Sequence, residues 1–237
     1  MLEMMLVTKK AGSGLPSDTG PGPTTLVGEY KRADGGHTGF FGTLPAGTFL
    51  TATALRTALG ITTGTVITES PVWMKFFIDG KVVFFPTTSI QHTISWETLY
   101  QKGAVYGISG PGTYPSPAGS PVAQTRTLTA GGRTYRVRMM SVNLTEPGPV
   151  GAINKSTEWG RLIFPINQGT LASATEGGAK WAEIDLGISS TGILVKDTYT
   201  STTFITAPFS NPTTLSTLNK QGSQSNIQWR PVLELIS

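Results

Sequence analysis

Two apolar runs separated by Asp79 and Gly80 constrain the fold more than any other feature of this sequence. The runs 73–78 (WMKFFI) and 81–85 (KVVFF) have the length and the aromatic and β-branched content of strands. Asp-Gly tolerates the positive φ angles of a two-residue hairpin turn, so the segment predicts a β-hairpin. Because both runs are apolar at consecutive positions, we expect both faces of the hairpin to be covered. The core would cover one face, and a helix, a second sheet or a neighbouring subunit the other.

The rest of the chain consists of short apolar runs between turn residues. Its 237 residues include 29 glycines and 16 prolines, a pattern typical of strands and turns with few helices. We predict a mainly β fold with a few short helices, in the α+β class. An extended N-terminal arm for assembly and attachment, 1–47, would precede a β-rich domain, 48–237, that is long enough to bury its own core.

The arm is predicted from residues 8–25, which are rich in glycine and proline. Such a stretch forms neither a helix nor a central strand. It becomes ordered only when something outside it holds it in place. We therefore expect the arm to lie on a neighbouring chain of an assembly.

Two short helices are predicted near 51–59 and 95–102. Thr51 and Ser95 are suitable N-cap residues, and Gly60 and Gly103 stand where the two helices should end. The sequence therefore places one helix before the 73–85 hairpin and one after it.

A second hairpin is predicted over 125–140. Alternation places Tyr135 and Val137 on one face and Arg136 and Arg138 on the other. We expect the arginine face to point outward.

The C-terminal segment 228–235 (QWRPVLEL) is a dense apolar run that follows a long polar stretch. Pro231 has no amide hydrogen, so we predict an edge strand, or a strand that begins at the proline, and not a central strand. A further aromatic anchor is predicted at 157–165, and one or two strands at 181–195.

Composition excludes several kinds of chemistry. The chain has no cysteine, which excludes disulfides, thiolate metal sites and cysteine nucleophiles. His37 and His92 stand far apart without acidic residues at metal-ligand spacing, so no metal site, catalytic triad or cofactor is predicted. No apolar stretch is long enough to cross a membrane, so membrane insertion is not expected.

The net charge of +4 comes from scattered basic residues. Nucleic-acid binding needs several cations on one surface, and we do not expect it here. The one cluster that could qualify consists of Arg126, Arg133, Arg136 and Arg138.

Aromatic and acidic residues leave two interpretations open. The five tryptophans could stack on sugars, but all lie in apolar runs, where burial in the core is favoured. We predict core positions for Trp73, Phe77, Trp96, Trp159, Trp229 and Leu233. A glycan-acting enzyme would need two carboxylates roughly 5 to 10 Å apart across a groove. The candidates are Asp34, Asp79, Glu97, Glu146, Glu158 and Asp185.

Six sequence blocks stand in a characteristic order: 73–76 (WMKF), 94–96 (ISW), 103–107 (GAVYG), 135–139 (YRVRM), 156–163 (STEWGRLI) and 229–235 (WRPVLEL). Together they resemble virion structural proteins of tailed bacteriophages, of the tail-fibre, collar, head-fibre or decoration type. The last block resembles the closing strands of C-type-lectin-like domains in phage adhesins and variable receptor-binding proteins. The resemblance covers about residues 70–237.

The chain departs from lectin relatives at two points. The calcium-dependent sugar site of C-type lectins needs Glu-Pro-Asn or Gln-Pro-Asp, whereas Glu146 and Pro147 are followed here by Gly148. Formylglycine-generating relatives need cysteine, and this chain has none. The resemblance thus implies neither calcium-mediated sugar binding nor that enzymatic activity.

In the phage adhesins, the display surface precedes the closing strand, which corresponds here to about 199–226. The candidate host-contact residues are Tyr199, Thr202, Phe204, Phe209, Asn211, Asn219, Gln224 and Asn226. The resemblance implies a noncatalytic component of the virion, assembled in the host cytoplasm. The arm would anchor the chain, and the β domain would contact the host surface. The alternative is a virion-associated glycan depolymerase.

The resemblance also implies partners. These are other virion proteins and a glycan or protein of the host cell surface. The hairpin runs that are apolar on both faces indicate contacts between copies of the chain in a homo-oligomer, and the way phage fibres are built favours a trimer. Closed cyclic symmetry is the usual arrangement of identical subunits, which agrees with a homo-oligomer. The sequence leaves the position on the particle open.

Overall fold

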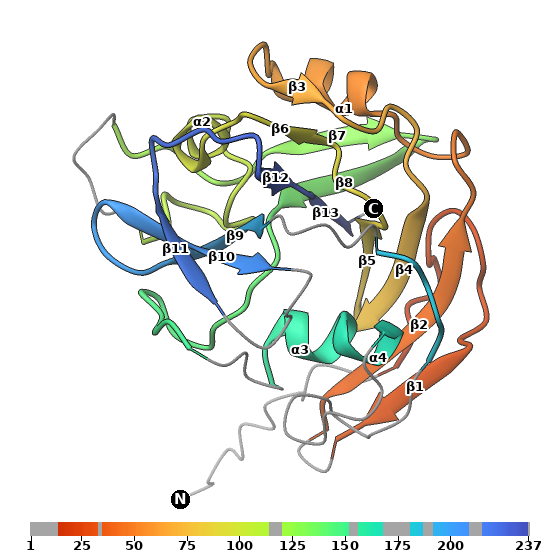
Figure 1. Cartoon of the computed structure of the whole chain (residues 1–237). Helices are drawn as coiled ribbons and strands as arrows, with labels where there is room; N and C mark the ends of the chain where they lie inside the picture. Colours follow the sequence, from red (N-terminus) through yellow and green to blue (C-terminus); the bar gives the residue numbers. More distant parts are fainter. Residues whose placement is uncertain are drawn as a thin grey trace, which may run out of the picture.

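In the computed structural model, the structure describes residues 14–32, 35–113, 120–151, 156–167, 181–186, 192–208 and 215–236. The strands form two β-sheets, and short helices lie against them (Figure 1). The predicted mainly β fold with a few short helices is confirmed.

The larger sheet has seven strands, and every neighbouring pair is antiparallel. Its strands, in spatial order, are β1 (Gly28–Lys31), β2 (His37–Leu44), β4 (Trp73–Ile78), β5 (Lys81–Pro86), β13 (Val232–Leu235), β8 (Arg133–Arg138) and β7 (Thr127–Ala130).

The smaller sheet has six strands and contains one parallel pair, β9 with β12. Its strands, in spatial order, are β11 (Ser216–Asn219), β10 (Thr203–Pro208), β9 (Gly192–Thr198), β12 (Ile227–Trp229), β6 (Gln91–His92) and β3 (Thr65–Val66). The strand predicted within 181–195 corresponds to β9, which extends beyond that range to residue 198.

The predicted hairpin at 73–85 is confirmed as β4 and β5. Its turn has Asp79 at φ 47° and Gly80 at φ 86°, as a two-residue turn of this kind requires. Every residue of β4 is buried. Alternation sends Trp73 and Phe77 into one hydrophobic cluster and Met74 into the other. The hairpin is therefore buried on both faces.

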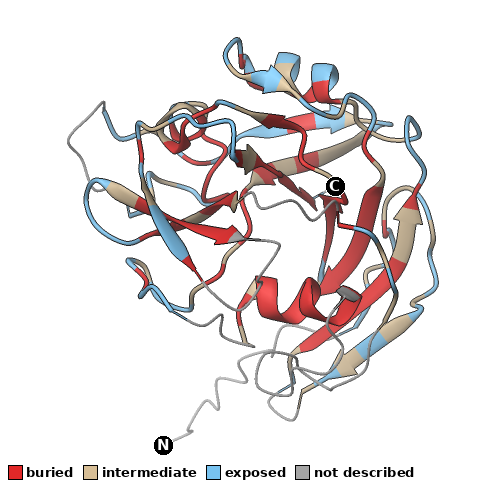
Figure 2. Cartoon of the chain, in the orientation of Figure 1, coloured by how far each residue is buried: buried red, intermediate tan, exposed pale blue. Residues whose placement is uncertain are grey.

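The chain itself covers both of these faces. One cluster includes apolar residues of α1 (Ala52–Leu59) and α2 (Trp96–Gln101), and the other includes those of α3 (Glu158–Leu162) and α4 (Phe164–Asn167) together with β9 and β10. Figure 2 shows β4, β5, β13 and α3 as buried. The apolar pattern of the hairpin therefore needs no neighbouring subunit, and the homotrimer stays a prediction without this support.

Both helices expected near the 73–85 hairpin form with their predicted caps. The Thr51 side chain accepts a hydrogen bond from the Ala54 amide, and Gly60 adopts the left-handed conformation after α1. The Ser95 side chain accepts from the Thr98 amide at the start of α2. The 157–165 segment, predicted as an aromatic anchor, contains α3 and the start of α4.

The C-terminal segment is central, and the predicted edge position is wrong. The alternative of a strand that begins at the proline comes close to β13, which begins at Val232. β12 lies between β9 and β6 in the smaller sheet, and β13 lies between β5 and β8 in the larger one. Pro231 falls in the two-residue link between these strands, so its missing amide hydrogen interrupts neither ladder. In Figure 1 the segment runs through the middle of the molecule and joins the two sheets.

The link is fixed by Arg230, which is buried. Its guanidinium donates to the Ser89 hydroxyl at 2.9 Å, the Thr87 carbonyl at 2.5 Å and the Leu186 carbonyl at 2.7 Å. These bonds satisfy polar backbone groups that the crossing would otherwise leave buried without partners.

The predicted arm, 1–47, includes parts of the domain. Residues 28–44 supply β1 and β2, and the preceding segment is held by Lys75 of β4. The Lys75 ammonium is fully buried and donates to the Thr19 hydroxyl at 3.1 Å and the Pro23 carbonyl at 2.6 Å. Burial lowers the pKa of Lys75 to about 8. The described segment from residue 14 onward thus lies on its own domain, whereas residues 1–13 lie outside the described residues.

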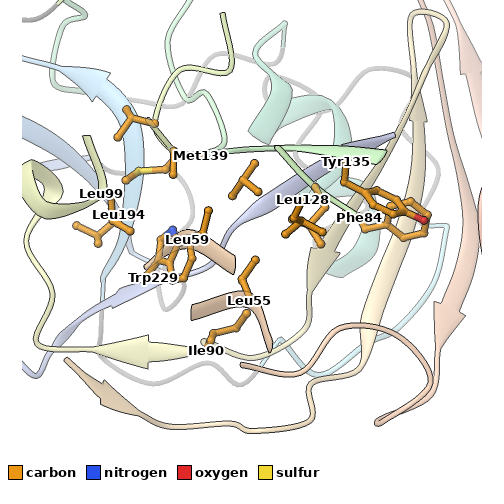
Figure 3. Packing of buried hydrophobic residues seen from close by; sticks show 14 of the residues in the cluster. Leu55, Leu59, Phe84, Ile90, Leu99, Leu128, Tyr135, Met139, Leu194 and Trp229 are labelled. Carbon is orange, nitrogen blue, oxygen red and sulfur yellow. The ribbon is translucent and has the colours of Figure 1, made fainter. Parts of the chain in front are cut away.

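The residues predicted for the core are all buried. Trp73, Phe77, Trp96, Trp229 and Leu233 belong to the first cluster, and Trp159 belongs to the second. Figure 3 shows Trp229 in the first cluster, together with Leu55 and Leu59 of α1. The fifth tryptophan, Trp181, is half-buried at the edge of the second cluster.

Candidate functional site

The predicted host-contact residues divide into exposed, buried and undescribed sets. Phe204 has 0% of its surface exposed and lies in the first core cluster, so the prediction that it contacts a host is wrong. Successive side chains of β10 point to opposite faces, so Phe204 enters the first cluster and Ile205 the second. Phe209 and Asn211 lie outside the described residues. The exposed set consists of Tyr199, Thr202, Asn219, Gln224 and Asn226.

The exposed set gathers on two neighbouring segments, 199–202 and 219–226, which we call the loop surface. The first segment joins β9 to β10, and the second runs from the end of β11 to β12. The cross-strand pair Thr203 and Asn219 places them side by side. In these two segments, all of which the structure describes, the single charged residue is Lys220, and it is buried. The loop surface is therefore polar but uncharged.

The buried side chain of Lys220 joins segment 219–226 to segment 199–202 on the inner side of the loop surface. Its ammonium donates to the carbonyls of Thr200 and Ser201, both at 3.3 Å, and lies 5.0 Å from the centre of the Trp96 ring. Its backbone amide donates to the Thr202 carbonyl at 2.9 Å. A cation over an aromatic ring is stabilised by the quadrupole of the ring. The loop surface thus rests on α2 through one buried lysine.

Backbone bonds add to this support. The Glu97 amide of α2 donates to the Lys220 carbonyl at 3.0 Å, and the Thr93 amide donates to the Gln224 carbonyl at 3.3 Å. The loop surface is therefore a fixed shape on the end of the smaller sheet.

A second feature is a cavity of about 340 Å³, which we call the charged cavity. Residues of both sheets, of α3 and of the 106–108 loop line it. They are Ile78, Asp79, Lys81, Tyr106, Gly107, Ile108, Arg138, Ser141, Glu158, Lys196 and Glu234.

Arg138 is the centre of the ion pairs around the charged cavity. Its guanidinium donates to both carboxylate oxygens of Glu158, at 2.7 and 2.6 Å, and to Glu234 at 3.0 Å. Lys81 and Arg136 also pair with Glu234, each at 3.2 Å. Burial alone would raise the pKa of Glu158, but the Arg138 charge and its hydrogen bonds bring that pKa below its usual value.

The predicted second hairpin is confirmed as β7 and β8, but its arginines do not face outward as expected. The Arg138 side chain is 11% exposed, because it lies between the carboxylates of Glu158 and Glu234. Arg136 is half-buried and lies opposite Glu234 in the ladder. The sheet continues past this hairpin through β13, and the closing strand supplies the acidic partner.

Asp79 combines its role in the hairpin turn with an ion pair. Its carboxylate accepts from the Arg161 guanidinium at 2.5 and 2.8 Å and from the His37 amide at 2.8 Å. Burial raises the pKa of Asp79, but the Arg161 bonds outweigh that effect and leave the pKa below its usual value.

Two buried carboxyl groups lie next to the charged cavity. Asp197 accepts from the Val142 amide at 2.7 Å and the Ser141 hydroxyl at 3.2 Å. Glu146 accepts from the Thr198 amide at 2.8 Å. Burial raises the pKa of Asp197 to about 7 and raises that of Glu146 as well. These groups tie the 141–148 segment to β9.

Gly107 allows the 106–108 loop to close over the charged cavity. It has φ 68°, and a Cβ atom built there would lie 2.7 Å from Cδ of Arg138 and 3.1 Å from Cδ of Arg136. Any larger residue would displace these arginines.

The sequence identified part of this arrangement. Asp79, Glu146 and Glu158 were among the candidate carboxylates, whereas Asp34 lies outside the described residues. Sequence reasoning missed Glu234 and Lys196. The alternation of Arg136 and Arg138 with apolar residues could have indicated that an acidic strand pairs with β8. Nothing local to Lys196 marks it as part of a cavity.

The basic cluster considered for nucleic-acid binding is held by acceptors of the chain itself. Arg133 pairs with Asp18 at 2.8 Å, and Arg126 donates to the Ala58 carbonyl. Arg136 and Arg138 take part in the ion pairs described above.

Comparisons with known proteins found no matching family model, no matching curated protein and no matching solved structure. Among the described residues, no group of three or more histidine, aspartate and glutamate side chains could hold a metal ion. None of the described helices has the length and apolar character that a membrane span requires.

Proposed function

We propose that this chain is a noncatalytic structural component of a bacteriophage virion and that it presents the loop surface to the host. The observation that carries the proposal is the loop surface itself: exposed, uncharged and fixed from below by Lys220. The order of the sequence blocks, from WMKF at 73–76 to WRPVLEL at 229–235, supports the class of particle.

The charge pattern of the cavity favours this function over the depolymerase alternative. Glycoside hydrolysis needs one carboxyl group that donates a proton near neutral pH. Asp79 and Glu158 line the charged cavity, but both have lowered pKa values and are held by arginines. The carboxyl group with a pKa of about 7, Asp197, is 1% exposed and does not line the cavity.

Membership of a particle can be tested with an antibody against the chain. A lysate that contains the protein would be separated on a density gradient, and each fraction would be probed. We expect the chain to band with intact particles and to be labelled on them in electron micrographs. Recovery only in the soluble fraction would contradict the virion role.

Host contact can be tested with paired loop variants. Gln224→Ala with Asn226→Ala removes two exposed polar side chains of the loop surface. We expect particles with these changes to assemble normally but to adsorb to the host about tenfold less well, as for the loss of one to two hydrogen bonds. Thr127→Ala with Thr129→Ala, on the exposed edge strand β7, is the matched control. Loss of assembly with the loop variant would indicate a purely structural role.

A further inference from the structure

We propose that the charged cavity binds an acidic sugar residue, with the ammonium group of Lys196 receiving the sugar carboxylate. The inference deepens the proposed function, because it names the chemistry of a host ligand, and it rests on that function for the source of the sugar. It is carried by the place of Lys196 in the cavity wall, where it forms no ion pair within the described part of the chain, by the size and walls of the cavity, and by its connection to the loop surface.

Three basic side chains and three carboxylates line the cavity, and two further arginines outside the wall also hold its carboxylates. Four basic side chains already hold its three carboxylates, Asp79, Glu158 and Glu234. These four are Lys81, Arg136, Arg138 and Arg161. Of these four, Lys81 and Arg138 line the cavity, and Lys196 is the third cation in its wall; within the described part of the chain Lys196 forms no ion pair. An anion entering the cavity would find this ammonium group available.

The charge of Lys196 acts on three nearby carboxyl groups and helps to lower the pKa values of Glu146, Glu158 and Asp197, but Lys196 forms no ion pair with them. Asp197 follows it on β9, and its oxygens accept from Val142 and Ser141. Burial raises the pKa of Asp197 to about 7, so this group is largely uncharged in mildly acidic solution. Lys196 therefore lies near carboxyl groups without a direct ion pair to any of them within the described part of the chain.

The walls of the cavity fit a sugar better than a bare inorganic anion. A volume of about 340 Å³ lies near the lower end of small-molecule pockets, roughly 300 to 1,000 Å³. Carboxylate oxygens can accept more than one hydrogen bond, so Glu158 and Glu234 can still accept from sugar hydroxyls. Ile78 and Ile108 supply an apolar wall for the C–H face of a ring, and Ile108 is 47% exposed.

The cavity is joined to the loop surface through β9. Lys196 stands three residues before Tyr199, where the loop surface begins. Between them, Thr198 donates its amide to Glu146 and accepts from the Gly148 amide at 2.8 Å. A ligand held by Lys196 would therefore lie beside the strand that leads into the proposed host contact.

The test is a titration of the purified full-length chain, followed by backbone amide chemical shifts. The probes are sodium glucuronate, glucose as its neutral counterpart, and inorganic phosphate as an anion without a sugar ring. We expect saturable shifts near Gly107, Ser141 and Lys196 with glucuronate. Glucose should give none, and phosphate should bind more weakly than glucuronate.

Two variants test the assigned residue. Lys196→Gln should weaken glucuronate binding by about tenfold or more, the effect of losing one charge-assisted hydrogen bond. Lys196→Arg should largely retain binding. Lys102→Gln removes the same charge from a different hollow, beside Gly60 and Arg126, and should leave binding unchanged. Unfolding midpoints would show that all three variants fold.

Several results would overturn the inference. They are the absence of saturable binding, equal binding by the folded Lys196→Gln variant, equal response to glucose, and phosphate binding as strong as that of glucuronate. If any of these occurs while the chain still bands with particles, the virion role stands without the sugar site. Glucuronate binding by a chain that never associates with particles would leave the sugar site and remove the virion role.

Discussion

The loop surface and the charged cavity are built on the same strand, β9, but they use opposite kinds of chemistry. The loop surface exposes hydroxyl and amide groups, and its one charge, Lys220, is buried beneath it. The cavity collects charged side chains from both sheets and pairs nearly all of them. Charge therefore has a different role in each region. Lys220 supports an uncharged surface from beneath, whereas ion pairs between side chains form the wall of the cavity.

This contrast has an energetic consequence. A buried ion pair contributes little net stability when it is intact, but the loss of one partner leaves an uncompensated buried charge. Replacing a buried lysine that donates to carbonyls leaves only neutral acceptors without a donor, and no buried charge. The cavity should therefore be much more sensitive than the loop surface to single substitutions.

The largest effect is expected from Arg138→Met. The substitution leaves Glu158 and Glu234 without their shared guanidinium, and it should lower the free energy of unfolding by about 3 to 5 kcal/mol. Chemical denaturation measures this change. Arg133→Met, which removes a solvent-exposed pair with Asp18, is the control and should leave the midpoint close to wild type. An equal loss of unfolding free energy in the two variants would contradict the greater sensitivity of the cavity ion pairs.

A smaller effect is expected from Lys220→Met. The carbonyls of Thr200 and Ser201 lose their donor, which should cost about 1 to 3 kcal/mol. Hydrogen exchange should become faster at the Thr202 and Thr203 amides, while β4 and β5 stay protected. Lys31→Met, at an exposed position of β1, should change neither quantity. Unchanged exchange in the Lys220→Met variant would contradict its role as the support of the loop surface.

The pH dependence of Asp197 should be the most gradual effect. Its folded pKa of about 7 lies above the ordinary value of 3.8, so the protonated form is favoured in the folded state. Its contribution to stability is present at low pH and is lost as the pH rises from about 4 to about 7. Wild type should therefore exceed Asp197→Asn in stability by more at pH 5 than at pH 7.5. Asp18→Asn, at an exposed carboxyl group with a lowered pKa, should show no such trend across this range. A constant difference between wild type and Asp197→Asn would contradict the raised pKa.

Local patterns predicted the parts of this fold that depend on neighbouring residues. The turn at Asp79 and Gly80 and the caps at Thr51 and Ser95 follow from short-range chemistry, and all of them form as expected. The burial of Trp73 and Trp229 follows from the apolar runs around them. These features need no knowledge of how distant segments meet.

Contacts between residues that are far apart in the chain could not be predicted from the sequence. Pro231 suggested an edge strand or a strand that begins at the proline, because a proline lacks the amide hydrogen of a central ladder, but it lies in the link between two central strands. Alternation along the hairpin placed Arg138 on a face that was expected to point outward. Its partners Glu158 and Glu234 are 20 and 96 residues away. A site that depends on such pairings becomes visible only in the folded structure.

The most direct test of the proposed role is an electron-microscopic reconstruction of intact particles from a lysate that contains the chain. The density should place the domain on the outside of the particle, with residues 199–202 and 219–226 directed to solvent. A domain on the particle whose loop surface is buried against another virion protein would contradict the proposed host contact. Absence of the chain from the particles would contradict the virion role itself.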